Sequence, residues 1–259
     1  MGFWVGFEWF GTVQTLSLRC KVTAMTLQPE GDRARSRGKT ARTPLTREAI
    51  VAAALTQIDA KGLEGLSMRT LGAALGVEAM ALYHHFPSKD ALLEGVMERL
   101  LVEVEMPPAG STPPLERLRR FVRSYRQIAV RHPHAFVLLA VRRFNSEAVF
   151  TLYERILDAL AEAGLDPVQS ARLFRLIGYY ASGAGLAEIA SRAQDPDAAP
   201  VSVEHAGDRQ RFPRVAAVAR YLRVSNLDAV FEFGLDVLFD EIRRQAALGR
   251  RAREEGPAE

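Results

Sequence analysis

Residues 74–93, ALGVEAMALYHHFPSKDALL, hold the densest group of chemically capable side chains in this chain of 259 residues. Tyr83, His84 and His85 follow one another directly, and Lys89 comes shortly after them. A phenol, two imidazoles and an ammonium group are typical of a metal site, a catalytic site or a surface that contacts negative charge. The spacing of these residues and the sequence around them discriminate among the three.

A metal site does not fit the spacing of the two histidines. Neighbouring residues on a helix point about 100° apart, so His84 and His85 face different directions, and no third ligand follows one turn later. Cys20 is the single cysteine of the chain, which excludes an internal disulfide and a cysteine-based zinc site and is consistent with a reducing cytosol. We therefore expect no metal and no cofactor, and a cytoplasmic protein.

A catalytic site is also poorly supported. Catalysis requires a nucleophile or a carboxylate beside the histidines, and Ser88 and Asp90 are better explained as residues that start a helix. An enzyme built on a helical bundle would need clustered carboxylates or a glutamate–histidine motif, but the histidines of residues 115–192 are His132 and His134, close to a helix start. We expect no catalytic residue, so the chain is predicted not to be an enzyme.

Two short helices, predicted at residues 67–75 and 77–84, are joined at Gly76 in the manner of a helix-turn-helix. The turn of that motif needs a residue that tolerates positive φ, which Gly76 provides, and Gly72 is the small residue needed where the backbones come close. The inward positions are apolar: Leu71, Leu75, Val77 and Leu82. The motif places its second helix in a DNA major groove, which favours a nucleic-acid interface.

The outward residues of this motif are predicted to contact DNA: Arg69, Ala79, Met80, Ala81, Tyr83, His84 and Lys89. Alanine and methionine make only apolar contacts with bases, for example with thymine methyl groups. Tyr83, His84 and Lys89 suit the phosphate backbone, and Arg69 suits a guanine or a phosphate. His85 either belongs to this surface or is partly buried and supports the helix.

Every other strong apolar pattern in the chain is also helical, so the fold is predicted to be all-α. Asp166, Pro167 and Gln169 indicate a capped helix start. Residues 193–213 are expected to form a long loop and residues 249–259 a disordered tail. The remaining helices are expected at about residues 47–61, 88–104, 115–130, 134–143, 146–163, 167–192, 214–223 and 225–248.

Residues 1–42 differ from the rest of the chain. Residues 1–24 are apolar without helical or strand periodicity, and we interpret them as a wrongly assigned extension rather than as a signal peptide or a membrane span. Residues 26–42 are polar and basic and are predicted to be disordered. Within them, the basic arm at 33–42 either adds phosphate or minor-groove contacts or is a solvated tail.

Residues 45–93 resemble the N-terminal domain of the TetR family of bacterial transcription regulators, most specifically at Leu75-Gly76-Val77, Leu82-Tyr83 and Phe86-Pro87-Ser88-Lys89. The segments LYERILDALAEAGL, LFRLIGYYASGAGL and FEFGLDVLFDEI are similar to the branch that contains the tetracycline repressor. The resemblance covers about residues 43–248. It implies a helix-turn-helix DNA-binding domain of three helices at 43–92 and a larger helical bundle at 93–248 for effector binding and dimerisation.

The resemblance implies a ligand-responsive transcriptional regulator, usually a repressor in this family, that binds a palindromic DNA operator as a homodimer and is released by a small molecule. The alternative is a helical dimerisation protein of the same fold without specific DNA binding. The helix at 167–192 and the last long helix are implied to pair across the dimer. Gly178, Gly183, Gly185 and Gly234 permit close approach either there or within one subunit.

The sequence departs from the tetracycline-binding pattern of that branch, in which histidines hold the drug–magnesium complex. Residues 89–105 contain no histidine, so we expect neither tetracycline nor magnesium but a largely apolar effector. For the apolar and aromatic residues expected to contact it, the alternative is a place in the core. For the arginine, the alternative is exposure to solvent. These effector candidates are Phe136, Leu139, Arg142, Phe144, Tyr179 and Tyr180.

Overall fold

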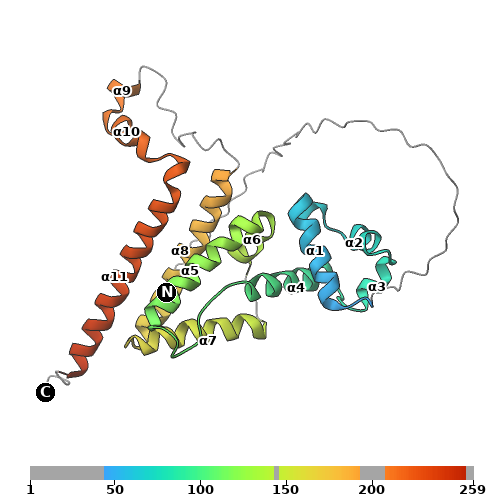
Figure 1. Cartoon of the computed structure of the whole chain (residues 1–259), viewed down its shortest axis with the longest axis horizontal. Helices are drawn as coiled ribbons and strands as arrows, with labels where there is room; N and C mark the ends of the chain where they lie inside the picture. Colours follow the sequence, from blue (N-terminus) through green and yellow to red (C-terminus); the bar gives the residue numbers. More distant parts are fainter. Residues whose placement is uncertain (1–43, 143–145, 193–207, 255–259) are drawn as a thin grey trace, which may run out of the picture. The chain divides into compact units, whose positions relative to one another are not determined.

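The computed structural model describes residues 44–142, 146–192 and 208–254, and within these ranges all regular elements are helices (Figure 1). The all-α prediction is therefore confirmed. None of the described helices is both long enough and apolar enough to cross a membrane. The expectations for residues 1–42 and for most of the 193–213 loop concern residues outside the described ranges.

The N-terminal helices largely follow the predicted boundaries. They are α1 (Arg47–Lys61), the 3-10 turn η1 (Leu63–Gly65), α2 (Met68–Leu75), α3 (Ala79–Tyr83) and α4 (Lys89–Val102). The Thr46 hydroxyl caps α1 by accepting a hydrogen bond from the Ala49 amide at 3.1 Å, and Gly62 ends the helix with a φ of 73°. The prediction for α3 was too long, because the Val77 amide bonds to the Gly72 carbonyl and belongs to the turn.

The C-terminal group includes the longest helices, α8 (Pro167–Arg192) and α11 (Leu227–Glu254). Its other elements are α5 (Pro114–Arg131), α6 (Pro133–Val141), α7 (Glu147–Glu162), α9 (Asp208–Arg211), α10 (Pro213–Val218) and the 3-10 turns η2 (Ala219–Tyr221) and η3 (Val224–Asn226). Asp166 and Gln169 exchange the two hydrogen bonds of the predicted cap of α8, at 2.8 and 3.1 Å. Two predictions were wrong: α10 gives way to 3-10 turns before residue 223, and α11 continues past Leu248 to Glu254.

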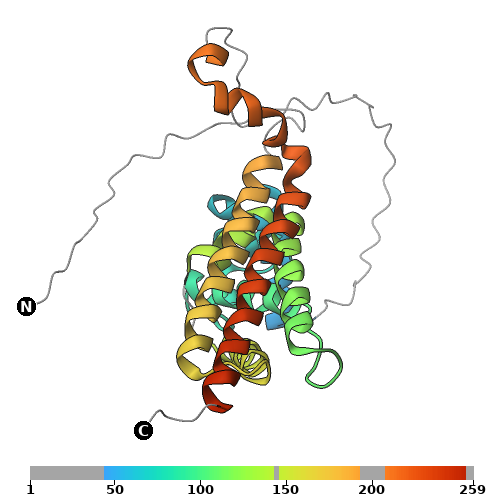
Figure 2. The ribbon, with the colours of Figure 1, turned by 90° about the vertical axis from the view of Figure 1, so that its left-hand side faces the viewer.

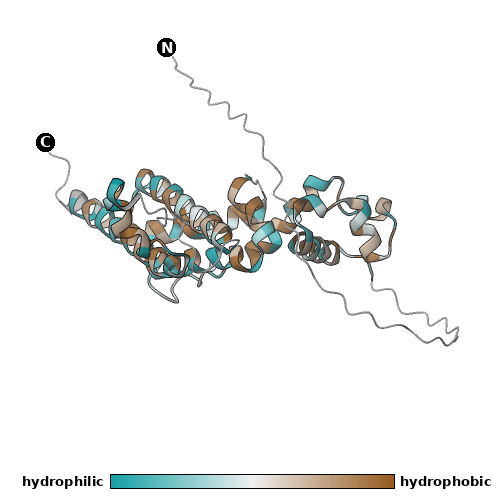
Figure 3. Cartoon of the chain, turned by 90° about the horizontal axis from the view of Figure 1, so that it is seen from above, coloured by the Kyte–Doolittle hydropathy of each residue, from teal (hydrophilic) through white to brown (hydrophobic). Residues whose placement is uncertain are grey.

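One hydrophobic cluster runs through both groups of helices, from Ile50 in α1 to Ala246 in α11. α5 lies at its centre and contacts α6, α7, α8 and α11. Its inward residues, among them Leu118, Val122 and Ile128, are fully buried, and hydrophilic residues occupy other sides of the helices (Figure 3). Burial of apolar surface stabilises such a core by about 25 cal/mol per Å².

α11 is fastened to α5 by three arginine–carboxylate pairs, which we call the arginine ladder. The pairs are Arg119–Asp236 (2.7 Å), Arg123–Glu232 (2.7 Å) and Arg126–Asp228 (2.6 Å), so the two helices run antiparallel. Arg126 is buried and also binds Glu188 of α8 at 2.5 Å. The Arg123 guanidinium donates hydrogen bonds to Glu232 and holds the pKa of that carboxyl below its usual range.

The glycines of α8 and α11 fall into two groups. A Cβ at Gly185 would lie 2.2 Å from the Phe136 ring, and a Cβ at Gly234 would lie 2.7 Å from a tyrosine hydroxyl of α8. Gly178 and Gly183 instead face open space. The first two glycines therefore serve packing within the subunit. The other two lie on the outer side of α8, which runs beside α11 (Figure 2).

We expect Gly185→Ala to lower the free energy of unfolding by about 1–3 kcal/mol, because the Phe136 ring must move to admit the methyl group. Gly249→Ala in α11 is the matched control, because a Cβ there meets no atom closer than 3.4 Å and alanine favours the helix by up to about 1 kcal/mol. Denaturant unfolding followed by circular dichroism measures both. Equal stability of the two variants would contradict the packing role of Gly185.

Candidate nucleic-acid interface

The turn between α2 and α3 depends on two glycines with different roles. Gly76 has a φ of 67° and a ψ of 30°, the left-handed conformation that glycine adopts at no steric cost. A Cβ at Gly72 would lie 2.8 Å from the Val77 carbonyl oxygen, and this backbone atom cannot move away without shifting the start of α3. Both roles predicted from the sequence are confirmed.

α2 is fixed to α1 by a polar network around Thr70. Ser67 and Thr70 form a capping box at the start of α2. The Gln57 side-chain amide, on α1, donates to the Thr70 hydroxyl at 2.8 Å and to the Gly65 carbonyl at 3.1 Å. α1 therefore serves as the base on which the helix-turn-helix is mounted.

α3 buries one side and exposes the other. Leu82 is fully buried, whereas Met80 and Tyr83 are 69% and 44% exposed. The two side chains lie three residues apart on the same face of α3, so together they form an exposed apolar patch suited to contact with a partner. The other outward residues predicted from the sequence are exposed at Arg69 and His84 and half-buried at Ala79 and Ala81.

Arg47 holds the turn after α3, a role that was not predicted from the sequence. Its guanidinium, at the start of α1, donates to the His85 carbonyl and lies 4.1 Å from the centre of the Phe86 ring. Phe86 is almost fully buried, and His85 is half-buried. These contacts join residues far apart in the chain, so no local sequence pattern predicts them. The half-buried side chain of His85 favours its supporting role.

Lys89 has structural partners within the protein. Its ammonium group donates to the Leu66 carbonyl at 2.7 Å and lies 3.5 Å from the Leu63 carbonyl. The start of α4 is thereby tied to the connection between α1 and α2. A phosphate contact by Lys89 would use its remaining donor capacity or replace these bonds. Ser88 caps α4 as expected, accepting from the Ala91 amide at 3.1 Å.

The charge of the helix-turn-helix region is low for a surface that meets phosphates. Residues 44–92 contain four Lys and Arg residues against five Asp and Glu residues. Two of the four cations, Arg47 and Lys89, are already bonded to backbone carbonyls. By contrast, residues 33–42 contain five basic residues and no acidic one.

The predicted effector residues point in different directions. Phe136 is buried, with its ring 5.2 Å from that of Tyr125, whose phenol pKa is raised to about 12 by burial. The Tyr180 hydroxyl donates to the Phe231 carbonyl at 2.5 Å. Tyr179 is 64% exposed on the outer side of α8. Phe136 therefore lies in the buried interior, whereas Tyr179 does not.

The remaining effector candidates lie around the end of α6. Leu139 is half-buried and packs against the core. Arg142 is exposed and pairs with Asp90 in the first turn of α4 at 3.0 Å. Phe144 lies outside the described residues. Arg142 is therefore engaged with α4 in this structure.

Two family models match these helices. Residues 50–96, which include α2, α3 and the turn between them, match the model described as bacterial regulatory proteins, tetR family. Residues 109–246, which run from before α5 into α11, match the tetracyclin repressor-like C-terminal domain. The chain belongs to the TetR family. It is therefore a DNA-binding transcription regulator and not an enzyme, which confirms both predictions.

Relatives of known name and structure agree with the TetR assignment. The class A tetracycline repressor from transposon 1721 of Escherichia coli is 30% identical, over 83% of this chain and 97% of its own length. A helix-turn-helix transcriptional regulator of Saccharopolyspora erythraea is 29% identical, over 71% of this chain and 72% of its own. Apo ActR from Streptomyces coelicolor is 26% identical, with a TM-score of 0.66, covering 79% of this chain and 99% of ActR.

We expect Gly72→Ala to weaken DNA binding by this TetR-family protein at least about tenfold, because the methyl group meets the Val77 carbonyl oxygen and displaces α3. Ala73→Ser, at the exposed neighbouring position, is the control and should bind as the parent does. Fluorescence anisotropy with DNA that flanks the gene measures both affinities. Parental affinity in Gly72→Ala would show that α3 tolerates displacement.

Proposed function

We propose that this TetR-family regulator is a repressor that binds a palindromic operator as a homodimer and leaves it when a small, largely apolar effector binds. The observation that carries the proposal is the exposed side of α3, with Met80 69% exposed, on a turn that glycine fixes. ActR, a structural neighbour, has been crystallised with actinorhodin, which supports control by a small molecule.

Base recognition by α3 is proposed to be mainly apolar. Met80 is the most exposed large apolar residue of the helix, and Ala79 and Ala81 flank it. Thymine offers a methyl group in the major groove that such side chains contact. Tyr83, His84 and Lys89 are assigned to phosphates, Arg69 to a guanine or a phosphate, and the basic arm at 33–42 supplies positive charge that residues 44–92 lack.

Replacement of the contacted thymine by uracil tests the role of Met80. Loss of the methyl group should weaken binding of the parent about fourfold, corresponding to about 0.8 kcal/mol for one buried methyl group. Met80→Ala should bind thymine and uracil operators equally, whereas Tyr83→Ala should weaken both and keep the preference. Anisotropy titrations of the three proteins, with thymine and uracil forms of an operator selected from random duplexes, give the six affinities.

The same titrations separate the two candidate functions. Binding that is lost in 0.5 M salt and selects one sequence at low salt supports a specific regulator. A parent protein that selects no sequence at low salt would favour a dimerisation protein without specific DNA binding.

Dimerisation is proposed to use the outer sides of α8 and α11. Their inner sides are buried in the core, yet exposed apolar residues recur on the outer sides at spacings of three, four or seven residues. They are Leu176, Tyr179, Leu186, Val230, Phe233 and Val237. Gly178 and Gly183 add no side chains to this surface, so a second helix pair can approach it closely.

We expect Phe233→Glu to convert the dimer to a monomer, because Phe233 is 70% exposed and a buried unpaired carboxylate opposes association. Phe150→Glu on α7 is the matched control, since Phe150 is 52% exposed on a helix outside this surface. Light scattering after size exclusion measures the mass of each variant. A dimeric Phe233→Glu would place the subunit contact elsewhere.

The effector site is proposed to involve the interior beside Phe136 and Leu139, with Arg142, Phe144 and Tyr180 as further candidates. The exposed Tyr179 faces away from this interior and is not included. To bind there, an apolar effector would displace the packed side chains around Phe136 and Tyr125. Two recognition helices must lie about 34–36 Å apart to enter successive major grooves. An effector releases DNA only if it binds a state with another spacing more tightly than the DNA-competent state.

A further inference from the structure

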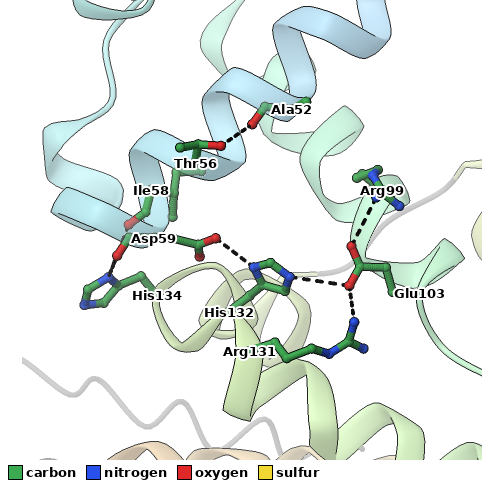
Figure 4. Close-up of polar contacts among 9 residues, drawn as sticks. All are labelled: Ala52, Thr56, Ile58, Asp59, Arg99, Glu103, Arg131, His132 and His134. Atoms are coloured by element: carbon green, nitrogen blue, oxygen red, sulfur yellow. Dashed lines mark hydrogen bonds and ion pairs between the residues drawn. The ribbon is translucent and has the colours of Figure 1, made fainter.

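His132 lies where α5 ends and α6 begins, and its imidazole reaches two carboxylates on other helices (Figure 4). Nδ1 lies 2.7 Å from Oδ2 of Asp59, in the last turns of α1. Nε2 lies 3.4 Å from Oε2 of Glu103, the C-cap residue of α4. We call the C-terminal helices α5–α11 the effector bundle. One side chain of this bundle thus contacts both α1, on which the helix-turn-helix is mounted, and the end of α4, which connects the helix-turn-helix to the bundle.

Further charged and polar groups complete this cluster. Arg131 of α5 binds the same Glu103 oxygen at 2.6 Å, and Arg99 of α4 binds the other at 3.5 Å. His134 of α6 has Nδ1 3.2 Å from the carbonyl oxygens of Ile58 and Asp59. The end of α1 is therefore held by two histidines, His132 at the α5–α6 junction and His134 in the first turn of α6.

The contacts of Asp59 make it dependent on His132. Its side chain is 29% exposed, and its Oδ1 is buried with no hydrogen-bond partner among the described residues. Oδ2 bonds to His132, so the carboxylate compensates for its partial desolvation through that one imidazole. The His132 and Glu103 side chains are 18% and 14% exposed, less than the 42% and 76% of the Arg142–Asp90 pair at the other end of α6.

We propose that Asp59, His132 and Glu103 form a histidine clamp that sets the orientation of α1–α3 on the effector bundle, with His132 as a positioning residue for DNA recognition. α1 holds α2 through Gln57 and holds the turn after α3 through Arg47. A rotation of α1 would therefore carry the whole helix-turn-helix with it. The clamp opposes that rotation at the far end of α1. The inference rests on the proposed operator binding.

Four substitutions separate the two arms of the clamp. His132→Asn retains a donor near the position of Nδ1 and loses the reach to Glu103, whereas His132→Gln has the longer reach. His132→Phe keeps a planar ring and removes both nitrogens. Asp59→Asn removes the charge from the α1 side. Glu232→Gln is the matched control, because it breaks an ion pair of 2.7 Å between α5 and α11 that does not involve α1.

Hydrogen exchange of the full-length protein tests the clamp without DNA. In His132→Phe and Asp59→Asn, amides in the last two turns of α1 should exchange about tenfold faster, while those of α8 remain as in the parent. His132→Asn should restore most of the protection, and Glu232→Gln should leave α1 unchanged. Parental exchange in α1 of both His132→Phe and Asp59→Asn overturns the clamp. If His132→Phe does not fold, Asp59→Asn against His132→Asn decides.

Operator spacing tests the positioning role. Inserting one base pair between the half-sites should weaken parental binding at least about tenfold, and His132→Phe or Asp59→Asn should reduce that penalty to about threefold or less. A merely stabilising residue would change affinity for both operators equally, and that result would reject the positioning role. If the parent selects no operator, the proposed function fails, and the exchange experiment still decides whether the clamp exists.

Discussion

The close approach of the Gly72 backbone to the Val77 carbonyl is the constraint on which the recognition surface depends. α3 has five residues, too few to be stable as an isolated helix, so its conformation is imposed by its surroundings. Leu82 anchors it from within, and Gly76 turns the chain into it. The exposed Met80 side is therefore the product of buried contacts, and small changes in the turn reach it directly.

The sequence predicted what is local and periodic. The Gly76 turn, the Asp166 and Ser88 caps and the apolar faces follow from residue types at fixed spacing, and the resemblance supplied the family. It did not predict contacts between distant segments. Arg47 with Phe86 and Lys89 with Leu66 depend on how helices cross, which no single segment encodes.

The same limit of sequence-based prediction applies to the glycines of α8 and α11 and to the effector candidates. Glycines in α8 and α11 suggested close packing from the sequence, but whether against the same subunit or a partner depended on the direction each one faces. Gly185 faces Phe136, and Gly183 faces outward. The aromatic candidates for the effector were chosen for their chemistry alone. Their directions diverge, because one side of α8 packs on the core and the other does not.

The arginine ladder limits how this protein can change in length. As the paired residue advances along α5, from Arg119 to Arg126, its partner recedes along α11, from Asp236 to Asp228. All three pairs therefore depend on one common register of the two helices. Deleting one residue within either helix turns everything beyond it by about 100° and separates the cations from their carboxylates. Insertions and deletions inherited over evolution should therefore accumulate in connections such as residues 106–113 and leave the interiors of α5 and α11 at constant length.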